Sequence, residues 1–266
     1  MKISCLQWNS DWEDSQSNLA RLESAIKLAT ANDFTTSNKA SVVVLPEMFN
    51  SGFSVSPQNF AESIESELVA HLALLAKNYH CYLIAGLATV EGETEESRRY
   101  LNSALVFNPA GQLMHHYDKQ KLFSFAHEQD AYKHGFKSQV FEIGGTPCAT
   151  FICYDLRFPE LFRAVAKSAE VIFVIANWPE ERQLHWEALL KARAIENQCF
   201  MIGVNRIGTD GNGLSYAGGS MVISPLGEVL AQGSSTDEMI QATITDGLAK
   251  ETRQNFPFLQ DMTNLS

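Results

Sequence analysis

The sequence has no run of basic residues. Its 31 Asp and Glu outnumber its 20 Lys and Arg, which gives a formal net charge of -11 at pH 7. Proteins that bind nucleic acid need clustered Lys and Arg to contact phosphates. We therefore expect no nucleic-acid partner, and we interpret the acidity as the charge of an ordinary soluble protein.

Long apolar runs and cysteine motifs are also missing. No stretch approaches the roughly 20 apolar residues of a membrane span, and MKISCLQWNSDWED lacks the apolar core of a signal peptide. The odd number of cysteines and the absence of C-x-x-C or Cys/His spacing argue against a disulfide framework and a zinc site. We expect a cytoplasmic protein with no membrane partner and no metal. The five cysteines are Cys5, Cys81, Cys148, Cys153 and Cys199.

The sequence does contain a regular alternation of strand-like and helical segments. The turn sequences NPAG and PLGE divide two of the strand-like segments into hairpins. Because no linker, repeat or low-complexity tract separates the segments, we expect one α/β domain with helices outside the sheet, and a two-domain split is the weaker alternative. The expected helices cover 18–30, 62–79, 159–168 and 179–198, and the expected strands cover 3–9, 41–49, 81–91, 101–123, 146–153, 169–178, 199–208, 220–233 and 239–245.

Three apolar segments lead into reactive side chains. Glu47 follows VVVLP, Lys119 and Lys121 lie in HHYDKQK, and Cys153 ends ATFIC. The ligand crevice of an open α/β sheet lies beyond the carboxyl ends of its strands, so Glu47 and Cys153 can meet there. A thiol, a carboxylate and an ammonium supply the nucleophile, the proton carrier and the oxyanion stabiliser of acyl transfer. Taken singly, each also suits a loop carboxylate, a surface lysine or an inert buried cysteine.

Four motifs in order resemble the nitrilase, or carbon–nitrogen hydrolase, superfamily. They are LPEMFNSGF, YDKQKLF, FICYDLRFPE and NWPEERQLHWEALLKARAIENQ, and the resemblance extends from the first strand to about residue 245. It implies an α/β fold of the nitrilase type, a four-layer α-β-β-α sandwich. The single carbon–nitrogen hydrolase domain would cover 1–266, with a short C-terminal extension from about 247. The resemblance implies no cofactor.

The resemblance also implies a Glu–Lys–Cys catalytic triad. Glu47 matches the general base and Cys153 the nucleophile. Lys119 matches the lysine of the family pattern Y-x-K-x-H-L-F, in which Lys121 replaces the usual histidine. Glu128, in FSFAHEQDAY, matches a second active-site glutamate that positions the lysine and the leaving amine.

Residues near these motifs have further expected roles. The backbone N–H of Tyr154 directly follows the nucleophile and is placed to help Lys119 hold the oxyanion. We expect a salt bridge of Arg157 to fix the turn after the nucleophile. Arg193 and Glu196 are spaced for an ion pair within one helix.

The substrate class follows from the closest branch of the resemblance. CYDLRFPE, ANWP and the pair His185–Trp186 look most like omega-amidases, which hydrolyse the terminal amide of 2-oxoglutaramate and succinamate. The far carboxylate of such a small-molecule amide needs a cation, and Arg182 is the candidate because a guanidinium binds carboxylate in bidentate fashion. Trp178 and Asn177 border the same crevice. An N-carbamoyl amino-acid hydrolase, another aliphatic amidase and an inactive scaffold of this fold are the alternatives.

The resemblance implies a homodimer as well, because members of the family commonly pair. The C-terminal segment ETRQNFPFLQDMTNLS contains FPF, which is expected to pack on a partner subunit.

Overall fold

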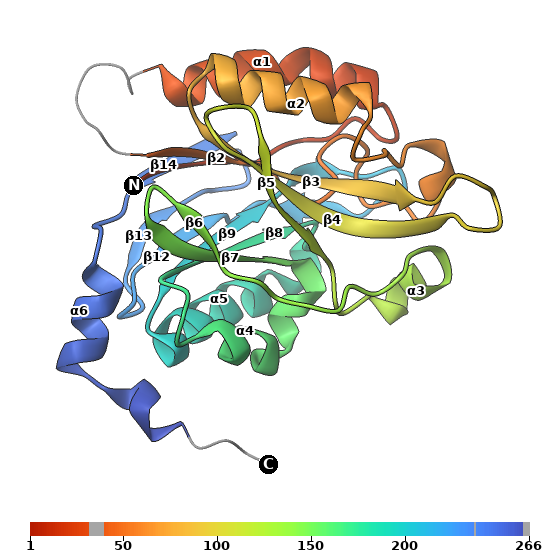
Figure 1. The fold of residues 1–266 in the computed structure, drawn as a ribbon. Coiled ribbons are helices and arrows are strands. Elements are labelled where there is room, and N and C mark those ends of the chain that lie inside the picture. Colours follow the sequence, from red (N-terminus) through yellow and green to blue (C-terminus); the bar gives the residue numbers. More distant parts are fainter. Residues whose placement is uncertain (32–39, 237, 263–266) are drawn as a thin grey trace.

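The computed structural model describes residues 1–31, 40–236 and 238–262. Within these ranges two six-stranded sheets lie face to face, and helices cover both outer sides (Figure 1). The strand order is β14-β1-β2-β3-β4-β5 in the first sheet and β13-β12-β9-β8-β7-β6 in the second. The predicted four-layer α-β-β-α sandwich is confirmed.

The first sheet is covered by two capped helices, α1 (Ser15–Thr30) and α2 (Glu67–Asn78) (Figure 1). The side chains of Asp14 and Ser66 accept hydrogen bonds from backbone N–H groups in the first turns, which would otherwise have no partner. The strands of this sheet are β1 (Lys2–Leu6), β2 (Ser41–Val44), β3 (Tyr82–Glu91), β4 (Arg99–Phe107), β5 (Leu113–Asp118) and β14 (Met239–Thr243).

The second sheet is covered by α4 (Pro159–Val165) and α5 (Gln183–Asn197) (Figure 1). Its central strands are parallel and buried on both faces, which explains their nearly continuous apolar sequences. The strands are β6 (Phe141–Ile143), β7 (Thr146–Ile152), β8 (Val171–Ala176), β9 (Phe200–Asn205), β12 (Met221–Ile223) and β13 (Val229–Gln232).

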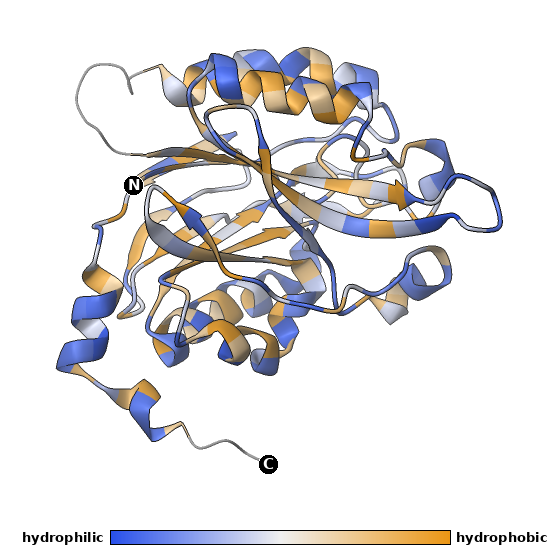
Figure 2. Ribbon diagram, in the orientation of Figure 1, coloured by the Kyte–Doolittle hydropathy of each residue, from blue (hydrophilic) through white to orange (hydrophobic). Residues whose placement is uncertain are grey.

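The hydrophobic core lies mainly between the two sheets, because one cluster of buried side chains draws on strands of both. Figure 2 shows mostly hydrophobic strands in the middle layers and a largely hydrophilic α6 (Leu248–Asn255) outside them. The other short elements are α3 (Glu128–Ala131), β10 (Ile207–Thr209) and β11 (Ser215–Ala217). None of the helices in the described ranges is both long and apolar enough to cross a membrane.

The two predicted hairpins are present, as the antiparallel pairs β4–β5 and β12–β13. The segment predicted as a strand over 41–49 leaves the sheet at Val44, and Pro46 beyond it has no N–H to donate to a neighbouring strand. Four short elements were not predicted, namely β6, β11, α3 and α6.

Candidate active site

Strands of both sheets end beside one another and bring the predicted residues together. Glu47 follows β2, Lys119 directly follows β5, and Cys153 directly follows β7. The Lys119 Nζ lies 2.9 Å from Glu47 Oε1, and the Cys153 thiol, which donates to the Asn177 carbonyl oxygen at 3.8 Å, lies close enough to both charged groups for them to shift its pKa. Glu47 and Lys119 are fully buried, and Cys153 is 9% exposed. A carboxylate, an ammonium and a thiol from separate sheets therefore share one buried site.

The backbone of Gly86 lies directly against the backbone of Glu47, and a glycine allows this close approach. A Cβ at Gly86 of β3 would lie 2.6 Å from both Glu47 Cα and the Pro46 carbonyl oxygen. Any larger residue at this position would push the Glu47 backbone away from the sheet.

Glu128 lies at the start of α3 and is also fully buried. Its two carboxylate oxygens accept hydrogen bonds from Lys119 Nζ at 3.0 and 2.9 Å. The backbone N–H of Phe123 donates to Glu128 Oε2 at 2.6 Å, so the loop before α3 is fastened to the same carboxylate. Glu128 and Glu47 thus hold the same Lys119 ammonium.

Asn102 of β4 is a site residue that sequence reasoning missed. Its Nδ2 donates to Glu47 Oε1 at 2.7 Å and to Glu128 Oε1 at 2.8 Å. The available signal was an asparagine within the apolar strand LNSALVF, where asparagine is unfavourable unless its side chain finds partners.

The predicted nucleophile, Cys153, lies on a sharp turn. Cys153 has φ of +45° and begins the short 3-10 helix η3 (Cys153–Arg157). Few non-glycine residues adopt this left-handed conformation, and such strain concentrates at functional sites. The Asp155 carboxylate fixes the turn by accepting hydrogen bonds from the Ile152 and Lys121 N–H groups and the Tyr117 hydroxyl, at 3.0, 2.8 and 2.8 Å.

The predicted salt bridge of Arg157 is not formed. Among the described residues no carboxylate pairs with its guanidinium, which instead contacts His185 Nδ1 at 3.1 Å and lies 4.9 Å from the centre of the Trp178 ring. Asp155 fixes the turn in its place. The predicted ion pair of Arg193 and Glu196 is present at 3.0 Å.

Lys121 is separated from the buried cluster, which resolves the choice between the two lysines. Its Nζ lies 4.8 Å from the centre of the Phe158 ring, and its backbone N–H donates to Asp155. Lys119 alone of this pair contacts Glu47 and Glu128.

The electrostatics of the cluster favour an ion pair beside a neutral thiol. Burial by itself would raise the pKa of Glu47, but the Lys119 ammonium and hydrogen bonds from Asn102 and Asn177 outweigh it and hold that pKa below its ordinary value. Burial would lower the pKa of Lys119, yet the Glu128 and Glu47 carboxylates keep it well above its ordinary value. Burial and the Glu47 charge raise the pKa of Cys153 well above the usual range of a thiol.

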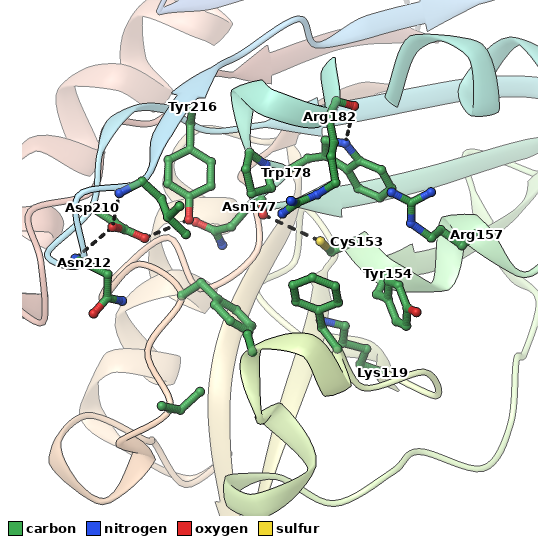
Figure 3. A pocket seen from close by; sticks show the side chains of 16 residues that line it. Lys119, Cys153, Tyr154, Arg157, Asn177, Trp178, Arg182, Asp210, Asn212 and Tyr216 are labelled. Carbon is green, nitrogen blue, oxygen red and sulfur yellow. Dashed lines mark hydrogen bonds between the residues drawn. The ribbon is translucent and has the colours of Figure 1, made fainter. Parts of the chain in front are cut away.

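A cavity of about 270 Å³ opens above Cys153 (Figure 3). This volume is near the lower end for ligand pockets and suits a small substrate. The side chains of Lys119 and Cys153 lie at its base, and Phe123, Trp178 and Leu214 contribute apolar walls. The remaining lining residues are Phe53, Val55, Ala126, Tyr154, Arg157, Asn177, Pro179, Arg182, Asp210, Asn212 and Tyr216.

Three lining residues are those predicted to bind substrate. Arg182 ends the 3-10 helix η4 (Glu180–Arg182), and its side chain extends beside Trp178 toward Cys153 (Figure 3). Trp178 is 3% exposed, and its indole N–H donates to the Arg182 carbonyl oxygen at 2.8 Å. Asn177 donates its backbone N–H to Glu47 Oε2 at 2.8 Å and its side-chain Nδ2 to the Glu47 carbonyl oxygen at 2.6 Å. The donors of Asn177 therefore hold Glu47.

Residues 2–254 match the family model for carbon–nitrogen hydrolases. The chain belongs to this family. It is 38% identical over 263 residues to the omega-amidase YafV of Escherichia coli (strain K12), covering 98% of this chain and 96% of that protein. It is 32% identical over 262 residues to the 2-oxoglutaramate amidase of Bacillus subtilis (strain 168), with the same coverage.

The fold is also similar to solved structures of the family. The CN-hydrolase superfamily protein XC1258 from Xanthomonas campestris, solved with an arsenic adduct in its active site, matches with a TM-score of 0.89 and 31% identity. The match covers 100% of this chain and 98% of XC1258. The protein is thus a hydrolase that acts on carbon–nitrogen bonds other than peptide bonds, and the Escherichia coli and Bacillus subtilis relatives are named as amidases.

In the part of the chain that the structure describes, no group of three or more His, Cys, Asp or Glu side chains is arranged to hold a metal ion.

Proposed function

We propose that this hydrolase removes the terminal amide of short dicarboxylate monoamides, such as 2-oxoglutaramate and succinamate, and releases the acid and ammonia. The buried cluster of Glu47, Lys119, Glu128 and Cys153 under a small cavity carries this proposal. Relatives named omega-amidase and 2-oxoglutaramate amidase support the substrate class.

The first step is attack of the Cys153 sulfur on the amide carbon. Because the pKa of the buried thiol is raised, its proton moves to Glu47 as the carbon–sulfur bond forms. The amide oxygen becomes an oxyanion. The Lys119 ammonium and the backbone N–H of Tyr154 stabilise it, and such preorganised donors are worth about 100-fold or more in rate.

The second half of the reaction returns the proton. Protonated Glu47 donates to the amide nitrogen, the carbon–nitrogen bond breaks, and ammonia leaves a thioester on Cys153. A water molecule then attacks the thioester carbon while Glu47 accepts its proton. The thiol is reprotonated as the carbon–sulfur bond breaks, so one amide and one water give one acid and one ammonia.

Arg182 is the proposed partner of the distal carboxylate. Its side chain is 25% exposed, lies 5.6 Å from the centre of the Phe123 ring and has a loose contact of 3.7 Å with Glu181, so a bound carboxylate can take the place of Glu181. Trp178 would pack against the carbon chain between the amide and the carboxylate.

Ammonia release from 2-oxoglutaramate and succinamate tests the proposal. We expect wild type to release ammonia and Cys153→Ala to lose activity to background. The matched control is Cys148→Ala, which removes another buried thiol of the same strand remote from the cluster and should stay active.

Inactivity of the wild type on both amides would overturn the substrate assignment. In that event, carbon dioxide release from N-carbamoyl amino acids would identify the alternative hydrolase, and turnover of butyramide would identify an aliphatic amidase.

A further inference from the structure

Asn102 lies between the two carboxylates of the cluster. Its Nδ2 contacts Glu47 Oε1 at 2.7 Å and Glu128 Oε1 at 2.8 Å, and Lys119 Nζ contacts the same two oxygens at 2.9 and 3.0 Å. Two donors and two acceptors therefore alternate around a closed ring. One donor of this ring is charged and the other is neutral.

We propose that Asn102 is a positioning residue for the reaction, whose side-chain amide fixes the spacing of the Glu47 and Glu128 carboxylates and keeps Glu47 directed at the Cys153 thiol as its proton acceptor. This inference rests on the proposed proton transfer, and it assigns a role that the triad alone does not require.

The hairpin formed by β4 and β5 builds the ring before any ligand binds. Ser103 pairs with Asp118, and the next backbone contact joins the Lys119 N–H to the Asn102 carbonyl oxygen at 2.8 Å. Residues opposite one another in an antiparallel pair direct their side chains to the same face. Both donors of the ring therefore come from facing positions of one hairpin.

The orientation of the amide is determined by its surroundings. Asn102 is fully buried, and its Oδ1 has no hydrogen-bond partner among the described residues. The reversed orientation would place that oxygen against two carboxylates and would lose both hydrogen bonds. The Asn102 Oδ1 is left without a hydrogen bond, which costs free energy in a buried site. In this orientation both N–H groups of the amide are directed at Glu47 and Glu128.

A neutral donor suits the charge balance of the site. Two carboxylates and one ammonium leave an excess of negative charge, which keeps Cys153 protonated until substrate binds and keeps Glu47 available as the acceptor. An aspartate in place of Asn102 would put three carboxyl groups around one ammonium. The titratable groups that face Glu47 from other elements are Lys119 after β5, Glu128 and Tyr132 in and after α3, and Cys153 after β7.

The variants Asn102→Asp and Asn102→Ser test the proposal, with Asn108→Asp as the control. Asn108 lies in the turn that joins β4 to β5, at the end of the hairpin away from Asn102 and Lys119, and its side chain contacts Gln112. A buried aspartic acid among carboxylates donates a proton only while it is uncharged. We expect kcat of Asn102→Asp to be about 100-fold below wild type near pH 8, with a clearly smaller deficit near pH 6.

Asn102→Ser keeps one donor in place of two. The ionised form of Glu47 then loses a hydrogen bond and its pKa rises, so the acid limb of the kcat/KM profile should move up by about one pH unit. Asn108→Asp should keep the wild-type profile. A deficit in Asn102→Asp that is the same at every pH, together with an unshifted acid limb in Asn102→Ser, would overturn the proposal.

Alkylation of Cys153 by chloroacetamide gives a readout that needs no turnover. The sulfur displaces chloride from the reagent and the thiol proton goes to Glu47, so the rate depends on the same proton acceptor. We expect the pH dependence of alkylation to shift in the two Asn102 variants as it does for catalysis. If the wild type hydrolyses no tested amide, the proposed function fails, while an unshifted alkylation profile rejects the role of Asn102 separately.

Discussion

Lys119 is a buried ammonium balanced by two carboxylates. Glu47 and Glu128 both contact its Nζ, and together they outweigh the burial that would otherwise favour the neutral amine. The same negative charge raises the pKa of Cys153. In the proposed reaction the resting thiol is therefore neutral, unlike that of cysteine enzymes that store a thiolate, and its proton has to move to Glu47 as the sulfur attacks.

At the scale of single residues, two arginines of the cavity, Arg182 and Arg157, can be compared as partners of the substrate carboxylate. Arg182→Met should raise KM for succinamate about 50-fold with little change in kcat, because a charge-assisted bidentate contact is lost from both ground and transition state. Hydrolysis of butyramide, which has no carboxylate, should not change. Arg157→Met is the matched variant, and a KM increase there but not in Arg182→Met would assign the carboxylate site to Arg157.

The residues themselves show what a sequence can and cannot predict about this site. The ends of apolar segments identified Glu47 and Cys153, and the family motif distinguished Lys119 from Lys121. An asparagine within an apolar strand was a signal that Asn102 has partners, but its role could not be predicted, because it depends on two carboxylates, one that follows β2 and one in α3. Nothing in the local pattern of β4 records those distant partners.

At the scale of elements, the turn after β7 depends on a single buried carboxylate. Asp155 ties the start of η3 to the end of β5, so it sets the position of Cys153 relative to Lys119.

Turn sequences predicted both hairpins because NPAG and PLGE carry local backbone preferences. The strand β6 has three residues and the helix α3 has four. Both are too short to show the periodic spacing of apolar residues by which strands and helices are predicted from a sequence.

Asp155→Ala should lower the free energy of unfolding by about 3 kcal/mol, because two backbone N–H groups and the Tyr117 hydroxyl lose their buried acceptor. Urea unfolding measures the loss, and Asp130→Ala, which removes an exposed carboxylate, is the control.

The difference in the free energy of unfolding between wild type and Asp155→Ala is expected to depend on pH. Burial raises the pKa of Asp155 to about 6 in the folded protein, above its unfolded value. A carboxyl group whose pKa is raised by folding contributes most to the free energy of unfolding below its unfolded pKa. For Asp155 this contribution declines as the pH rises through about 6. The difference between wild type and Asp155→Ala should therefore narrow over that range, and a widening would contradict it.

At the scale of the whole molecule, the site exists only where the two sheets meet. Glu47, Asn102 and Lys119 come from one sheet and Cys153 from the other, so separation of the sheets dismantles the cluster.

We propose that the chain also pairs as a homodimer through its C-terminal segment. The Phe256 and Phe258 rings lie 5.9 Å apart and are 46% and 64% exposed, which is unusual for adjacent aromatic side chains.

Light scattering coupled to size-exclusion chromatography should give a mass of twice the 29.5 kDa chain. Phe258→Asp should shift the protein toward the monomer by placing a charge in the proposed apolar contact. Phe136→Asp alters an aromatic residue that is 83% exposed elsewhere on the chain and should leave the mass unchanged. A monomeric wild type would exclude the dimer.

The left-handed backbone at Cys153 has an evolutionary consequence. At φ of +45° a glycine would be relaxed where cysteine is strained, so folding and catalysis favour different residues at this position. In the proposed reaction, a single substitution to glycine would remove the nucleophile and relieve the backbone strain. In a duplicated copy of the gene, only the proposed catalytic role would favour cysteine over the relaxed glycine at this position.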